Sequence, residues 1–100
     1  MQSRIATSIS ELARNIFLYA GSGTITIAIV AKEGKKGLHI IAIDEGPGIP
    51  DIRRSLEDGY TTSGALGAGL PGVRRMMDSF DIESVPGKGT RVDVIKWCEQ

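Results

Sequence analysis

The hydrophobic pattern at the start of the chain predicts an amphipathic helix. Apolar side chains recur there at spacings of three and four residues, at Ile5, Ile9, Leu12, Ile16 and Ala20. This spacing places them on one face of a helix over residues 3–20. The Gly-Ser-Gly segment that follows ends the helix, because glycine is common just past a helix C-terminus.

The next two apolar segments predict a pair of strands. Residues 24–30 alternate threonine and isoleucine, which is typical of a strand with two different faces. Residues 38–44 are apolar on both faces, which indicates a central strand. A polar turn at residues 32–37 separates the two, so we expect an antiparallel hairpin.

The second half of the chain alternates turns with short regular segments. In order, the sequence predicts a turn at 44–50, two helical turns at 51–58, a loop at 59–69, a helix at 70–79, a strand at 80–85, a turn at 86–89 and a strand at 90–97. The order of elements predicts an α+β fold, a two-layer sandwich in which helices cover one face of a mostly antiparallel sheet.

Composition narrows the class of protein. The 100 residues make one domain at most, and 41% hydrophobic with 24% charged residues is ordinary for a soluble globular domain. Twelve basic side chains balance twelve acidic ones, so we expect neither a nucleic-acid nor a membrane partner. No apolar run approaches the ~20 residues that span a bilayer. The single cysteine, Cys98, suits a reducing cytoplasm.

Glycine is the anomaly in the composition, with 13 of 100 residues against an average of about 7%. The densest stretch, at residues 64–72, lies just before a predicted helix. Consecutive backbone N–H groups at the positive end of a helix suit a di- or triphosphate, although a flexible linker would also be rich in glycine. The stretch matches Gly-x-Gly-x-x-Gly, but a dinucleotide-binding fingerprint must directly follow a strand, and here a polar loop precedes it.

Two polar side chains on the first helix are candidates for chemistry. Glu11 and Asn15 are four residues apart, so they lie about 40° apart on one helical face. The carboxylate could serve as a base, and the amide oxygen is a hard ligand that suits Mg²⁺. The structural alternative is a solvated pair on an exposed face.

A third candidate carboxylate ends the expected central strand. Asp44 could accept a hydrogen bond from the exocyclic amine of a nucleotide base. Gly46 and Gly48 would let a flat ring approach the backbone. The structural alternative is an Asx-capped Gly-Pro turn, in which Asp44 bonds only its own neighbours.

The combination of these segments is more specific than any of them alone. Glu11-x-x-x-Asn15, Asp44-x-Gly46-x-Gly48, the glycine stretch and Gly89-Thr90 occur in that order. The chain thereby resembles the GHKL ATPase superfamily (gyrase, histidine kinase and MutL type), whose nucleotide domain has the Bergerat fold. It is most similar to the small serine/threonine kinases of bacterial sigma-factor switches, on segments 10–15, 44–53, 62–73 and 95–97.

The front of the chain departs from this family pattern. Members begin with a strand and a helix that precede the Glu11–Asn15 helix, and these are missing here. We therefore expect that the chain starts late and leaves a strand edge unpaired. Because an unpaired edge tends to find another chain, we expect the chain to be stable only as a homodimer, with its partner protein, or as part of a longer protein.

The resemblance also implies an activity. The chain would be a cytoplasmic kinase that transfers the γ-phosphate of ATP to a serine or threonine of STAS-domain stressosome proteins. It would then activate a PPM-type phosphatase by binding it. Asn15 would ligate Mg²⁺, and Glu11 would accept the proton of the acceptor hydroxyl or orient that hydroxyl. Asp44 would bind the adenine amine, with support from Thr90 through a water.

The resemblance assigns the remaining site residues to the nucleotide as well. Gly46 and Gly48 would line the purine pocket, and backbone N–H groups near the phosphates would come from Gly64, Gly67, Gly69 and Leu70. Two alternatives stay open. One is an anti-sigma-factor kinase on the same fold, and the other is a nucleotide-gated binding module without useful kinase activity.

Overall fold

A computed structural model describes residues 2–48 and 69–98 of the chain. In chain order the elements are α1 (Gln2–Ala20), β1 (Gly23–Lys32), β2 (Lys35–Asp44), α3 (Gly69–Met76), β3 (Ser79–Val85) and β4 (Gly89–Trp97). The helical turns expected at 51–58 and the loop expected at 59–68 lie outside the described residues.

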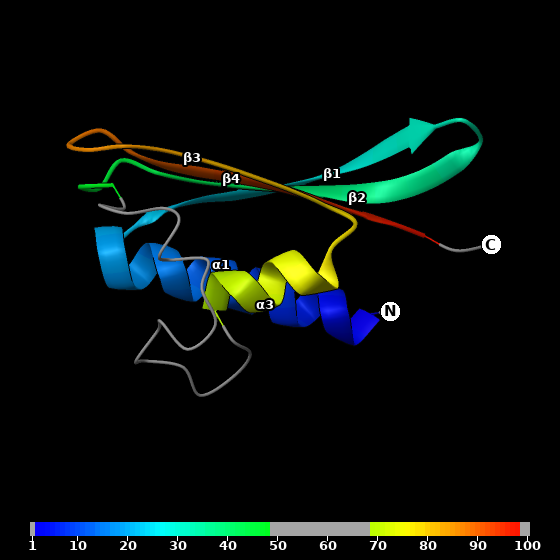
Figure 1. The fold of residues 1–100 in the computed structure, drawn as a ribbon, viewed down its shortest axis with the longest axis horizontal. Coiled ribbons are helices and arrows are strands. Elements are labelled where there is room, and N and C mark those ends of the chain that lie inside the picture. The colour runs from blue at the N-terminus through cyan, green and yellow to red at the C-terminus, as the bar shows by residue number, and fades with distance from the viewer. Residues whose placement is uncertain (1, 49–68, 99–100) are drawn as a thin grey trace.

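The strands form one antiparallel sheet with both helices on the same face (Figure 1). The strand order is β1-β2-β4-β3, so β2 is central, as its apolar sequence predicts. The predicted α+β two-layer arrangement is therefore confirmed. In the same ranges, 2–48 and 69–98, no helix is both long and apolar enough to cross a membrane.

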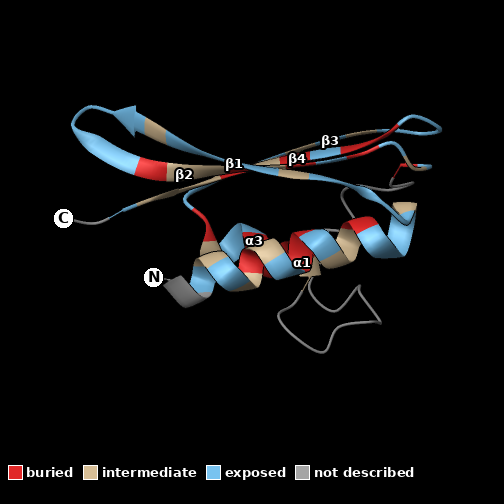
Figure 2. Ribbon diagram, turned by 180° about the vertical axis from the view of Figure 1, so that it is seen from behind, coloured by how far each residue is buried: buried red, intermediate tan, exposed pale blue. Residues whose placement is uncertain are grey.

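The core lies between the sheet and the helices, where buried residues gather on the facing surfaces of the two layers (Figure 2). Its members are Leu12, Ile16, Ile40, Ala42, Leu70, Val73, Met77, Val92 and Val94. Burying each large apolar side chain contributes roughly 1.5–3 kcal/mol. The α1 stripe enters this core, with Leu12 and Ile16 buried and Ile5 and Ile9 packed at its margin.

The β1–β2 hairpin is longer than predicted. Its strands pair as far as Lys32 and Lys35, so the turn contains only Glu33 and Gly34. Both have positive φ values, 53° and 82°, which fits the tight turn that follows the twist of paired strands. The charged residues near the tip resemble a loop in sequence, yet their side chains are simply solvated on an exposed end of the hairpin.

Helix α3 ends at Met76, three residues before the predicted end at 79. The segment between α3 and β3 is held by Asp78, whose backbone N–H donates to the Ile95 carbonyl (2.9 Å). Its carboxylate accepts a hydrogen bond from the backbone N–H of Trp97 (2.7 Å). These bonds tie the residue to β4, so the chain leaves the helix and enters β3 at Ser79.

Candidate active site

A row of polar side chains crosses one end of the sheet. Asp44 pairs with Thr90 across β2 and β4, and Thr90 pairs with Ser84 across β4 and β3. Directly opposed residues point to the same face, and Asp44 shares its face with the core residues Ile40 and Ala42. The Asp44–Thr90–Ser84 row therefore faces the helix layer. Asp44 and Thr90 are both 7% exposed.

Hydrogen bonds fix this row. The Thr90 and Ser84 hydroxyls are 2.9 Å apart, and the Ser84 hydroxyl also donates to the Gly89 carbonyl (3.3 Å). The backbone N–H of Gly46 donates to Asp44 Oδ1 (3.0 Å). The Asx turn considered as the structural alternative is thus present. It occupies one carboxylate oxygen and leaves Oδ2 without a hydrogen bond in the described part of the chain.

The glycines around this row are required by close packing. A Cβ at Gly46 would lie 2.5 Å from the Ala20 Cβ at the end of α1, and one at Gly48 would lie 2.7 Å from the Val85 carbonyl oxygen. At Gly89 a Cβ would collide with the Asp44 carbonyl oxygen, and φ is +126° there. The sequence predicts that Gly46 and Gly48 let a flat ring approach the backbone, and the structure adds that close packing requires a glycine at both positions.

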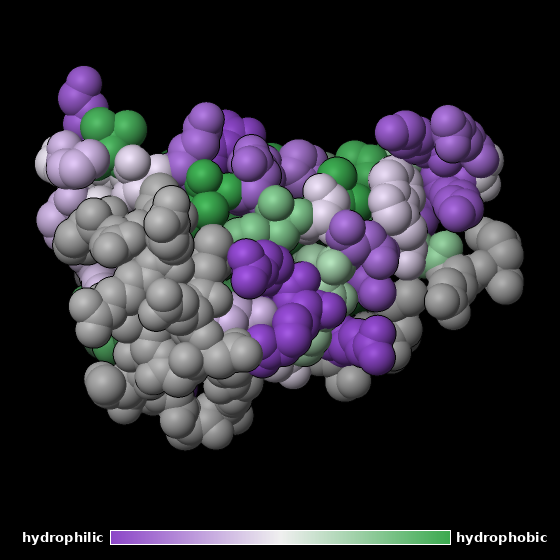
Figure 3. Space-filling model, in the orientation of Figure 1, coloured by the Kyte–Doolittle hydropathy of each residue, from purple (hydrophilic) through white to green (hydrophobic). Residues whose placement is uncertain are grey.

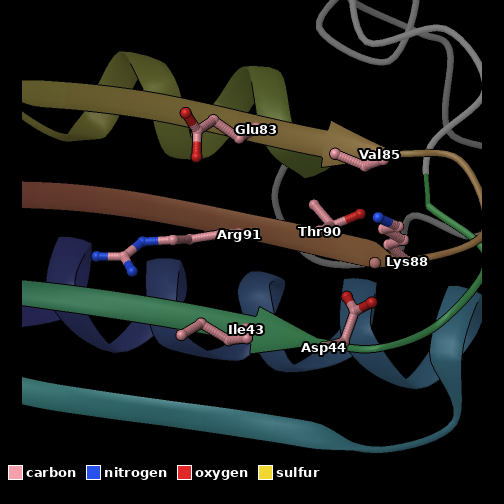
Figure 4. A pocket seen from close by; sticks show the side chains of 8 residues that line it. Ile43, Asp44, Glu83, Val85, Lys88, Thr90 and Arg91 are labelled. Carbon is pink, nitrogen blue, oxygen red and sulfur yellow. The ribbon is translucent and has the colours of Figure 1, made fainter.

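A pocket of about 200 Å³ opens at this end of the sheet (Figure 4). Asp44, Lys88, Gly89 and Thr90 form one side of it. The other lining residues lie on the sheet face away from the helices: Ile43, Glu83, Val85 and Arg91. The alternation of side chains explains this, because residues one position apart on a strand point to opposite faces. The pocket therefore lies mainly on the sheet face away from the helices, and the buried Asp44 and Thr90 border it at the end of the sheet.

Glu11 is buried on α1, with only 3% of its surface exposed. Among residues 2–48 and 69–98, its Oε2 atom has no hydrogen-bond partner. The exposed-face alternative is therefore wrong for Glu11. Burying a carboxylate oxygen without a partner costs free energy, so natural proteins keep one mainly where it has a function or where water or a ligand satisfies it.

Asn15 lies one turn further along α1 and is half-buried. Its donor chemistry fits Mg²⁺, because the amide oxygen is a hard ligand and Mg²⁺ is commonly held by one or two protein oxygens together with substrate phosphates and water. Within residues 2–48 and 69–98 there is no cluster of three or more His, Cys, Asp or Glu side chains that could hold a metal by itself.

Helix α3 begins beside the middle of α1 and runs back towards the α1 N-terminus (Figures 1 and 2). Gly69, with φ +66°, and Leu70 form its first turn. The first N–H groups of a helix lack partners inside it and carry partial positive charge. The expected phosphate-binding N–H groups of Gly69 and Leu70 are thus at a helix start, whereas Gly64 and Gly67 lie outside the described residues.

The outer face of the sheet carries a separate polar cluster. Asp93 bonds Arg91 through two hydrogen bonds (2.8 and 3.1 Å) and His39 Nε2 through one (3.0 Å). The hydrogen bond from Arg91 lowers the pKa of the Asp93 carboxyl, partial burial opposes it, and the His39 hydrogen bond lowers it further. This cluster gives His39 a structural role on the outer face of the sheet.

Two contributors to the site were missed in the sequence. Ser84 supports Thr90 through its hydroxyl, and Ser8 is fully buried on α1 one turn before Glu11. The position of Ser84 opposite Thr90 is known only once the register of β3 and β4 is known. Nothing in the local sequence distinguishes Ser8 from an ordinary helical serine.

The comparisons with known proteins decide the family. The family described as histidine kinase-, DNA gyrase B-, and HSP90-like ATPase matches residues 1–99. The chain belongs to this ATPase family. The resemblance inferred from the ordered motifs is thereby confirmed.

Individual ATPase relatives and a solved structure agree with this assignment. The chain is 67% identical over 96 residues to the serine/threonine-protein kinase RsbT of Bacillus subtilis (strain 168), covering 96% of this chain and 72% of that protein. It is 34% identical over 99 residues to the anti-sigma F factor of Caldanaerobacter subterraneus subsp. tengcongensis, covering 93% of this chain and 68% of that protein. The crystal structure of full-length ShkA in complex with AMPPNP matches with a TM-score of 0.68 and 25% identity, over 93% of this chain and 21% of that chain.

Proposed function

We propose that the chain is an ATP-dependent protein serine/threonine kinase of a bacterial stress-signalling switch. Its family is one of ATPases, and a relative with two thirds of its residues identical is named a serine/threonine-protein kinase. The sequence motifs also predict a serine/threonine kinase. The observation that carries the proposal is the Glu11 carboxylate, which is buried on α1 with an oxygen that no group in the described part of the chain bonds.

The order of side chains along α1 supports one direction for bound ATP. Gly46, beside Asp44, packs on Ala20 at the end of the helix. Asn15 and Glu11 precede Ala20 by about 7.5 and 13.5 Å of helix, at 1.5 Å per residue. Adenine at Asp44, phosphates beyond it at Asn15 and the transferred group near Glu11 would therefore lie in sequence along one helix.

Each group then has a defined task. Asp44 would accept the adenine amine through the oxygen that the Asx turn leaves open, and Thr90 would assist through a water. Asn15 would hold Mg²⁺, which neutralises phosphate charge when it is bound. Glu11 would orient the acceptor hydroxyl and take its proton, and Gly69 and Leu70 would offer N–H groups to the phosphates. Such catalysis consists mostly of positioning and charge stabilisation.

The proposed acceptor is a serine or threonine of a STAS-domain stressosome protein, and the proposed later partner is a PPM-type phosphatase. The similarity to the RsbT kinase supports this choice over the alternatives. The similarity to anti-sigma F factors supports the second candidate, a kinase on the same fold that binds a sigma factor directly.

Phosphoproteomics can separate these candidates. The chain is incubated with Mg-ATP and a recombinant STAS-domain protein, and separately with an extract of the source cells, and new phosphosites are identified by mass spectrometry. We expect a serine or threonine of the STAS protein to gain phosphate. Capture of a sigma factor with no phosphorylated STAS domain would favour the second candidate. Nucleotide binding without any transfer would leave only a binding module.

A further inference from the structure

Two side-chain oxygens are buried without a partner in the described part of the chain, and both lie on α1. One is Glu11 Oε2, and the other is the hydroxyl oxygen of Ser8, which is 0% exposed. Helical serines commonly donate to the carbonyl one turn earlier, but this hydroxyl has no such bond. Buried hydroxyls rarely remain unsatisfied, so Ser8 needs an acceptor.

The helix places these two groups together. Ser8 and Glu11 are three residues apart, which separates them by about 4.5 Å along the axis and about 60° around it. Side chains at this spacing are neighbours on a helix surface. At about 100° per residue, Leu12 and Ile16 lie on the opposite side of Ser8 from Glu11 and Asn15. Ser8 therefore stands at the border between the apolar stripe and the polar strip.

We propose that Ser8 is a positioning residue for Glu11, donating its hydroxyl hydrogen to the carboxylate directly or through one buried water. The inference rests on the proposed role of Glu11 in proton transfer. The hydroxyl is the only kind of group in this pair that can donate, and an ionised carboxylate only accepts. The bond would satisfy both buried oxygens at once and hold the carboxylate in the orientation that the acceptor hydroxyl requires.

The test compares Ser8→Thr with Ser8→Val, because threonine and valine have the same shape and differ by the hydroxyl. Threonine adds a methyl group at this fully buried position, and valine also replaces the hydroxyl by a methyl group of similar size, so both variants carry similar packing strain. We expect Ser8→Val to lower kcat for phosphoryl transfer about tenfold relative to Ser8→Thr, the scale of one hydrogen bond to a charged group. The KM for ATP should stay the same in both. Ser10→Ala, at an exposed serine of the same helix, should leave kcat unchanged.

A second measurement asks whether Ser8 acts through Glu11. Ser8→Ala is made alone and together with Glu11→Gln, and kcat is measured for all four proteins. If Ser8 works by orienting the carboxylate, its substitution should cost much less in the Glu11→Gln background, because residues acting as a unit are non-additive. Circular dichroism melts show that each variant is folded at the assay temperature.

The outcomes separate this inference from the proposed function. If Glu11→Gln keeps full turnover, the proposed role of Glu11 is wrong, and the proposed role of Ser8 is wrong as well. If Glu11→Gln loses turnover while the Ser8→Thr and Ser8→Val variants have equal kcat, only the Ser8 inference is overturned. Equal losses from Ser8→Ala in both backgrounds would also overturn it, because Ser8 would then act independently of the carboxylate.

Discussion

At the scale of single residues, the site uses polar groups that are buried but incompletely satisfied. Asp44 is held by the Gly46 N–H through one oxygen, and Glu11 has an oxygen without a partner among the residues that the structure describes. Fixing one oxygen of Asp44 while leaving the other open prepares this carboxylate for a ligand without allowing it to rotate. This is the physical basis of preorganisation, in which ordering is complete before the ligand arrives.

Asp44→Asn should weaken ATP binding about 10-fold or more, because an amide in place of the carboxylate loses a charge-assisted hydrogen bond to the adenine amine. Asn15→Ala should bind ATP like the parent when Mg²⁺ is removed with EDTA, since its proposed contact is through the metal. Isothermal titration calorimetry with and without Mg²⁺ measures both. Equal losses for the two variants in EDTA would contradict this division of roles.

Gly89→Ala should destabilise the fold more than Gly87→Ala. Both glycines have positive φ, but a Cβ at Gly87 meets no atom within 4 Å, whereas one at Gly89 collides with the Asp44 carbonyl oxygen. We expect roughly 1 kcal/mol for Gly87→Ala from backbone strain alone, and a few kcal/mol for Gly89→Ala. Urea denaturation gives both free energies of unfolding. Similar values would mean that β4 shifts away from Asp44 at no cost.

At the scale of elements, each segment of the site depends on a partner that is distant in sequence. The first turn of α3 lies beside α1, and the Asp44–Thr90–Ser84 row requires the correct register of three strands. The outer-face cluster of His39, Asp93 and Arg91 links β2 to β4 in the same way. Cross-strand pairs of this kind are the unit by which side chains stabilise a sheet.

Asp93→Asn should lower the melting temperature at neutral pH, and the loss should disappear in acid. The Arg91 hydrogen bond lowers the pKa of the Asp93 carboxyl in the folded chain. The ionised carboxylate therefore contributes its full stabilisation at any pH above the pKa of an unfolded aspartate. This contribution is lost as the pH falls through the lower pKa of the folded chain. Melts from pH 7 to pH 2 test this, with Glu45→Gln, at an exposed carboxylate outside this cluster, as the control. A difference in melting temperature between the parent and Asp93→Asn that does not change with pH would contradict the ionic contribution.

The sequence predicts the elements with clear periodicity and fails where structure depends on non-local contacts. The α1 stripe and the central position of β2 follow directly from apolar spacing. The two-residue hairpin turn does not, because charged residues continue the strands to Lys32 and Lys35. The α3 end is set by bonds from Asp78 to β4, and the support of Thr90 by Ser84 is set by sheet register. Neither pairing can be read from local sequence.

At the scale of the whole molecule, apolar surface remains uncovered at the β1 edge. Ile27 and Ile29 on this strand are 50% and 77% exposed, and Phe17 near the end of α1 is 71% exposed. In the view of Figure 3, apolar side chains otherwise alternate with polar ones along the sheet side of the molecule. An edge strand with exposed isoleucines presents unpaired backbone groups together with apolar area.

We therefore expect the 100-residue chain to self-associate through the β1 edge. Analytical ultracentrifugation should show a mass above that of a monomer at micromolar concentration, and the melting temperature should rise with concentration. Ile29→Thr, which keeps a β-branched residue, should weaken the association, while Thr26→Ser on the same strand should not. A monomer whose melting temperature does not depend on concentration would refute the expected homodimer.

The central claim is that α1 carries the catalytic carboxylate for phosphoryl transfer, and Glu11→Gln tests it most directly. Transfer of labelled γ-phosphate from saturating Mg-ATP to a STAS-domain protein is measured in single turnover, together with the ATP dissociation constant. We predict a transfer rate lower by about 10²-fold or more, the usual scale for a general base, with ATP affinity nearly unchanged. A Glu11→Gln variant that transfers phosphate as fast as the parent would contradict the account.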